Sequence, residues 1–251
     1  MENNTNNSAY RRFLTVLFAV IAILIPVTAM AQTDGGRRKR PKPRTEQTTS
    51  LKKPDKKSSK KKRPDYNGHD YVDLGLPSGL KWATCNVGAS SPEEYGGYYA
   101  WGETAVKDSY NLSSSLTANM SDQELRAAGI IDASNNLTMQ HDAARVNCGG
   151  SWRMPTKAEL EELVDKCTWT WSEQEGRKGY KVIGPNGNSI FLPAAGWQNL
   201  GFYCGGKGGI YNGSTVLENS DKAFRIRFSI SNHYMQSHFR YFGASVRPVS
   251  E

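Results

Sequence analysis

Short apolar stretches, separated by turn-forming residues, make up most of the chain after position 65. The stretches 69–76 and 80–87 flank a Pro-Ser-Gly turn, and the stretches 180–183 and 189–192 flank a segment that contains Asn186 and Gly187. An Asn-Gly pair tolerates the positive φ angles of a tight hairpin turn. The pattern therefore predicts two antiparallel hairpins.

Two more strands are predicted near the end of the chain, at 223–230 and 241–249. The segment between them is polar and rich in aromatic residues, and it is predicted to be a connection. Short strands alternating with turn signals are typical of a small, loop-rich domain.

Helix signals occur at three places and rest on the capping box, in which Ser or Thr and a Glu three residues later satisfy each other's amides. Thr156 and Glu159 precede a predicted helix at 157–165, with Leu160, Leu163 and Val164 on its apolar face. Ser121 and Glu124 predict a shorter helix, and the segment 91–94 repeats the signal with Pro at the first helical position.

The N-terminus has the composition of an export signal. Arg11 and Arg12 precede an apolar run at 13–29, and Ala29 and Ala31 supply the small residues of a cleavage site before Gln32. We expect residues 1–31 to be a signal peptide and the protein to be exported, to the periplasm, the outer surface or the medium. The alternative is a retained transmembrane helix, which Pro26 and the cleavage site disfavour. No Cys follows the run at a position for acylation.

Positive charge is concentrated in residues 32–64, which are predicted to be a disordered basic linker. Residues 37–63 hold 14 Lys and Arg against two acidic residues, whereas residues 64–251 hold 16 basic and 20 acidic side chains. Such a run can contact anionic lipid or an acidic envelope polymer, or act only as a solvated spacer. Nucleic acid is not an expected partner, because the run has no aromatic residues for stacking on bases.

Several motifs in the second part of the chain occur in a characteristic order. They are Val72-Asp73-Leu74-Gly75-Leu76-Pro77-Ser78-Gly79-Leu80-Lys81-Trp82-Ala83, Tyr99-Ala100-Trp101-Gly102-Glu103, Gly150-Ser151-Trp152-Arg153-Met154-Pro155-Thr156-Lys157-Ala158-Glu159-Leu160, Phe191-Leu192-Pro193-Ala194-Ala195-Gly196 and Ser245-Val246-Arg247-Pro248-Val249. This series resembles the Fibrobacter succinogenes major paralogous domain family and, more distantly, formylglycine-generating-enzyme-like proteins.

The resemblance covers residues 65–251 and implies one α+β domain with a C-type-lectin-like fold: a twisted antiparallel sheet, a few short helices and long loops that present a ligand surface. Some members of this fold family are variable targets of diversity-generating retroelements, which change Asn codons near the C-terminus. The stretch 197–242 has the matching residue types, but an ordinary aromatic-rich loop has them as well.

A ligand-binding site is expected in this stretch, because Tyr, Trp and Phe provide rigid contact area while Ser, Asn and Gly adapt their hydrogen bonds. Trp82, Trp101 and Trp152 lie in framework motifs and are predicted to be core residues instead. The candidate ligand-binding residues are Trp197, Asn199, Phe202, Tyr203, Tyr211, Asn212, Asn232, His233, Tyr234, His238, Phe239, Arg240 and Tyr241.

The four cysteines allow disulfides in an exported protein, with three possible connectivities. Cys85 and Cys167 lie in family-like segments, so the resemblance favours a bridge between them, while two free thiols are the alternative. Cys148 and Cys204 lie where the chain departs from the family pattern.

No enzyme activity, cofactor or metal is predicted. A formylglycine-generating oxidase needs paired reactive cysteines near the C-terminus, where this chain has Cys204 alone. The four histidines have no ligand spacing, and the segment 218–221 is a weak calcium candidate. We expect a protein or glycan ligand; the alternatives are such an oxidase, or a structural envelope protein held by its basic run.

Overall fold

The computed structural model describes residues 65–251, so the predicted signal peptide and basic linker lie outside the described residues. Within this range the chain is a mixed α+β domain of small antiparallel sheets and three short α-helices, which confirms the predicted class. No helix in residues 65–251 is long and apolar enough to cross a bilayer.

The helices are α1 (Asp122–Ala127), α2 (Ala143–Cys148) and α3 (Lys157–Lys166), with a 3-10 turn, η1, at Leu112–Ser114. The strands are β1 (Tyr71–Asp73), β2 (Lys81–Ala83), β3 (Thr168–Gln174), β4 (Arg177–Ile183), β5 (Ser189–Pro193), β6 (Trp197–Gln198), β7 (Phe202–Tyr203), β8 (Gly208–Val216), β9 (Lys222–Ser229), β10 (Asn232–Phe239) and β11 (Val249–Ser250).

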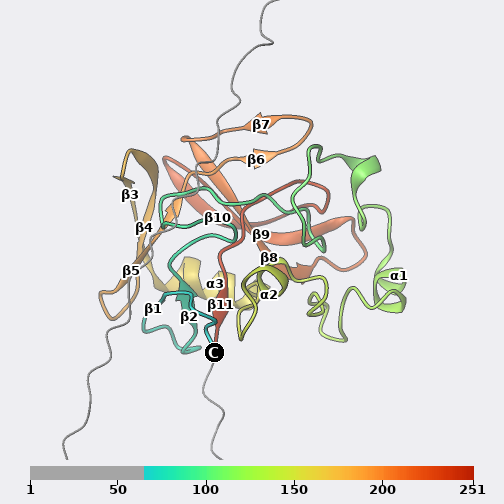
Figure 1. The fold of residues 1–251 in the computed structure, drawn as a ribbon, viewed down its shortest axis with the longest axis horizontal. Coiled ribbons are helices and arrows are strands. Elements are labelled where there is room, and N and C mark those ends of the chain that lie inside the picture. Colours follow the sequence, from blue (N-terminus) through green and yellow to red (C-terminus); the bar gives the residue numbers. More distant parts are fainter. Residues whose placement is uncertain (1–64) are drawn as a thin grey trace, which may run out of the picture. The chain divides into compact units, whose positions relative to one another are not determined.

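Three three-stranded sheets and one hairpin form the β-structure. Their strand orders are β1-β2-β11, β3-β4-β5 and β10-β9-β8, with β6 and β7 as a two-stranded pair. The sheet β10-β9-β8 lies at the centre of the domain, and the β6–β7 hairpin projects beyond it (Figure 1). An isolated bridge between Gly196 and Gly209 holds this hairpin beside β8.

The two faces of the central sheet have different surroundings, because successive side chains of a strand point to opposite sides. Tyr211, Ile226 and Phe228 pack on one side with Leu160 and Leu163 of α3. The same apolar cluster includes residues of the β3-β4-β5 sheet. This side of the central sheet is therefore part of the hydrophobic core.

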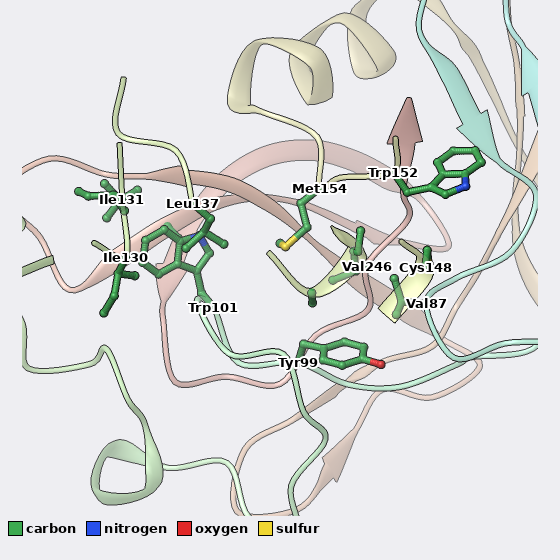
Figure 2. Packing of buried hydrophobic residues seen from close by; sticks show 14 of the residues in the cluster. Val87, Tyr99, Trp101, Ile130, Ile131, Leu137, Cys148, Trp152, Met154 and Val246 are labelled. Carbon is green, nitrogen blue, oxygen red and sulfur yellow. The ribbon is translucent and has the colours of Figure 1, made fainter. Parts of the chain in front are cut away.

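A second apolar cluster contains Trp101 and Trp152, both with no exposed surface. Figure 2 shows Tyr99, Trp101, Met154 and Val246 converging within this cluster. Trp82 is also buried, in the first cluster. The predicted core role of these three framework tryptophans is confirmed.

Most local predictions agree with the structure. The hairpins form as β1–β2 and β4–β5, and α1 and α3 begin at the predicted capping boxes of Ser121 and Thr156. The segment 91–94 forms only a turn, because Gly96 follows at a φ of 70° and ends any helical path.

The end of the chain differs more from the predictions. The predicted connection after 230 is a full strand, β10, and most of the predicted strand 241–249 is irregular except at β11. Strand β10 pairs with β9 alone, so it is an edge strand whose outer side can carry polar residues. Its composition therefore did not resemble that of a buried strand.

A buried arginine, Arg247, connects separate sheets. Its Nη1 donates to the backbone oxygens of Ala83 (3.1 Å) and Thr84 (2.7 Å), its Nη2 to the oxygen of Phe191 (2.8 Å), and its Nε to Asn86 Oδ1 (2.9 Å). No described carboxylate forms an ion pair with this guanidinium. Carbonyl dipoles therefore stabilise its charge.

Arg247→Met removes all four of these bonds, three of which are buried. We expect the free energy of unfolding to fall by at least about 3 kcal/mol, measured by urea denaturation. Arg177→Met is the control: Arg177 is exposed on β4, so its loss should change stability by less than about 1 kcal/mol. Equal effects of the two substitutions would contradict the role assigned to Arg247.

Candidate functional site

Exposed aromatic side chains gather where the β6–β7 hairpin meets the central sheet. Phe202 is 52% exposed, Tyr203 46% and Tyr234 40%, while Trp197 and Arg227 are partly exposed. Four of these residues, Tyr203, Trp197, Arg227 and Tyr234, are called the Trp197 row below, because a ring or cross-strand contact links each to the next. They come from β6, β7, β9 and β10, whereas Phe202 points to the other side of the hairpin from Tyr203.

The hairpin end of the row is built by pairing of two short strands. Trp197 lies directly opposite Tyr203 in the register, and their rings stack with centroids 6.1 Å apart and planes 16° apart. Phe202 packs edge-on against Tyr98 at 6.0 Å. Glycine is required at position 196, since its φ is 65° and a Cβ atom there would lie 2.1 Å from the backbone oxygen of Tyr203.

Arg227 joins the hairpin to the sheet. Its guanidinium lies 5.2 Å from the ring centroid of Trp197, and the residue is the cross-strand partner of Tyr234. A cation over an aromatic face is attracted by about 0.5–2 kcal/mol, depending on desolvation. In the described chain no carboxylate forms an ion pair with Arg227.

Behind the row lies a buried polar group on the same face of the sheet. Arg225 of β9 has no exposed surface and faces Asn212 of β8 and Gln236 of β10 in the register. Its Nη2 donates to the backbone oxygens of His238 and Phe239, but its Nε and Nη1 have no partner. Asn212 Oδ1 and Gln236 Nε2 are also buried without a partner.

The charge of Arg225 is poorly compensated. Burial lowers its pKa to about 9, which still leaves the guanidinium protonated at neutral pH. Burial, followed by repulsion from Arg225, Arg227 and Lys222, lowers the pKa of His238 to about 4. This face of the sheet therefore carries uncompensated positive charge.

The structure brings only some of the predicted ligand-binding residues to this surface. Trp197, Tyr203 and Tyr234 belong to the row, and Phe202 is exposed on the other side of the same hairpin. Two further candidates lie nearby: Asn199 is partly exposed in the hairpin turn, and Asn232 is exposed on the same face of β10 as Tyr234.

Three predicted residues lie in the interior instead. Tyr211 packs against Phe228 and donates to the oxygen of Pro193, Asn212 donates to the oxygen of Tyr99, and Arg240 donates to the oxygen of Met120. Their polar atoms form hydrogen bonds inside the domain, and the side chains are buried, so they are not available to contact a ligand.

Four more predicted residues belong to other clusters. His233 points to the opposite face of β10 and stacks on Trp169 with centroids 4.6 Å apart. His238, Phe239 and Tyr241 form a partly buried group around Phe242.

Two important residues of the site were not predicted, namely Arg227 in the row and the buried Arg225 behind it. Both lie in a strand in which Phe224, Ile226 and Phe228 alternate with them. That period of two signals that the arginines share one face while the apolar residues share the other. The signal was available in the sequence.

The predicted Cys85–Cys167 disulfide is not formed, since all four cysteines are free thiols. Cys85 lines a hollow together with His69, Cys148 and Trp152, whereas Cys167 ends α3 and packs on the other apolar cluster. The two thiols therefore belong to different parts of the domain. Among residues 65–251 no three His, Cys, Asp or Glu side chains come together to hold a metal.

The segment 218–221, considered above for calcium, borders a hollow of about 490 Å³. Asp122, Asn219, Asp221 and Arg240 line it. Arg240 brings a buried guanidinium whose Nε and Nη1 are unpartnered, so a cation would meet like charge at this place.

The lowered pKa of His238 predicts a pH-dependent stability. Below its ordinary pKa of 6.5 the unfolded chain binds a proton that the folded chain accepts only near pH 4. Stability contributed by neutral His238 is therefore lost as the pH falls between these values. Because the side chain is only half-buried, solvent screening reduces the effect, and we expect a loss of roughly 1–2 kcal/mol.

Urea denaturation at pH 7.0 and 4.5, for the protein and for His238→Asn, measures this contribution. The variant should lose less stability on acidification than the parent, because carboxylate titration is common to both. Equal losses would show that His238 titrates normally.

Comparisons with models of known protein families, with curated proteins and with solved structures gave no match to this chain.

Proposed function

We propose that the protein is an exported, receptor-like ligand-binding protein of the major paralogous domain family, with a C-type-lectin-like domain that binds a glycan or protein through the Trp197 row. The observation that carries the proposal is the gathering of exposed aromatic side chains and an unpaired arginine on one surface.

Exposed aromatic groups on a rigid frame are favourable for binding. Stacking between Trp197 and Tyr203 and the strand pairing beneath them fix both rings before a ligand arrives. Little conformational entropy is then lost on association, and the large ring faces provide contact area. Trp, Tyr and Arg are also the residues that most often dominate binding energy at interfaces.

The alternative of an oxidase like the formylglycine-generating enzymes has less support. Cys204 lies exposed in the turn after β7. The other three cysteines lie near β2, at the end of α2 and at the end of α3, on separate elements. Paired thiols at one site are what the chemistry of that group requires.

The proposal predicts that the row, and not exposed apolar surface in general, holds the ligand. The purified protein is tested on arrayed glycans and bacterial-surface and host-surface proteins, and Trp197→Ala and Tyr234→Ala are tested on any ligand found. Each substitution should weaken binding by at least about tenfold, which corresponds to about 1.4 kcal/mol.

Met139→Ala is the control variant, since Met139 is 64% exposed and lies outside the row. Its affinity should equal that of the parent. Thermal unfolding of all variants checks that the fold is intact. A ligand whose binding is insensitive to both row substitutions would place the binding site elsewhere and overturn the proposal.

A further inference from the structure

We propose that the ligand of the Trp197 row is an acidic polysaccharide whose carboxylate or sulfate group is bound by Arg227. This inference rests on the proposed function and names the chemical class of its ligand. The sequence indicated acidic partners only for the basic linker, and neither an acidic ligand of the domain nor a role for Arg227 was expected.

The first argument is the position of Arg227. Its guanidinium lies over the ring of Trp197, which stacks with the exposed Tyr203, and its cross-strand partner is the exposed Tyr234. The cation–π contact engages the guanidinium only through a ring face, and no described side chain forms a hydrogen bond or an ion pair with it. The planar fork of an arginine matches a carboxylate or sulfate in two-point geometry.

The second argument is the charge behind Arg227. Two residues earlier on the same face, Arg225 is fully buried, and its bonding partners are two backbone oxygens rather than a carboxylate. Two of its nitrogens remain unpartnered beside Asn212 Oδ1 and Gln236 Nε2. A charge without a counter-ion in a low-dielectric interior acts over a longer distance than one in water.

The ionisable residues around Arg225 also indicate a positive potential at this face. Arg225, Arg227 and Lys222 all act on His238, and no acidic group contributes there. Asp122 and Asp221 act instead on Arg240. An anion at the row therefore gains from several cations, although only Arg227 is placed to contact it.

The aromatic residues favour a polysaccharide over an acidic peptide. Trp197 and Tyr203 present nearly parallel rings on a short hairpin, and Tyr234 extends the aromatic surface across the sheet. The exposed parts of the Tyr203 and Tyr234 rings suit the flat apolar faces of sugar rings, while Trp197, in contact with both Tyr203 and Arg227, supports them.

The test compares binding of the whole protein to polygalacturonate, dextran sulfate, neutral dextran and poly-glutamate by biolayer interferometry. Arg227→Gln should weaken binding to one or both acidic polysaccharides about tenfold. Arg227→Lys, which keeps the charge but loses the fork, should fall between this variant and the parent.

Arg177→Gln is the matched control. Arg177 also lies over an aromatic ring, at 5.0 Å from the Tyr95 centroid, but on β4 and outside the row. The charge change is the same, and the 14 basic residues of 37–63 contribute the same background in every variant. We expect a change within about twofold for this control.

Equal losses for Arg227→Gln and Arg177→Gln would show that binding follows net charge alone, and would overturn the inference. Preferential binding of poly-glutamate through Arg227 would also overturn it, in favour of an acidic protein ligand. If a neutral glycan bound, with sensitivity to Trp197→Ala but not to Arg227→Gln, the inference would fail while the proposed function stood.

Discussion

The buried guanidinium of Arg247 joins parts of the chain that no sheet hydrogen bond connects. It donates to carbonyl oxygens at the end of β2 and in β5 and to Asn86, whose side-chain amide in turn donates to the hydroxyl of Tyr211 on the central sheet. Strands this short bury little apolar area each, so their relative positions depend on contacts between sheets. A rigid donor with five N–H groups in a fixed plane sets those positions at several points at once.

The frame set in this way determines where the Trp197 row lies. Tyr211, Ile226 and Phe228 hold one face of the central sheet against α3, which leaves the other face for Arg227 and Tyr234. The β6–β7 hairpin then adds Trp197 and Tyr203 beside that face, at a separation fixed by the close approach at Gly196. Side chains from four strands thus meet on a surface that no single segment could supply.

Local signals in the sequence predicted local structure well. The capping box of Thr156 and the Asn-Gly turn at Asn186 act within a few residues, and both formed as predicted. The strand β10 was missed because its polarity reflects its place at a sheet edge, which is a property of the tertiary structure. The candidate residues divided in the same way: composition indicated the right stretch, but it could not separate the buried Tyr211 from the exposed Tyr203, since burial depends on which face meets the core. In strand β9, by contrast, the alternation of Arg and apolar residues in the sequence did indicate which side chains share a face.

The alternation in β9 and β10 also places residues under different structural constraints on the two faces of the sheet. Residues on the core-facing side hold the sheet against α3, whereas Arg227, Tyr234 and Asn232 on the other side touch few core residues. Substitutions at these outward positions can therefore accumulate with little loss of stability. Alternate residues of these two strands are therefore free to vary in chemistry, while the remaining residues of the same strands keep the architecture constant.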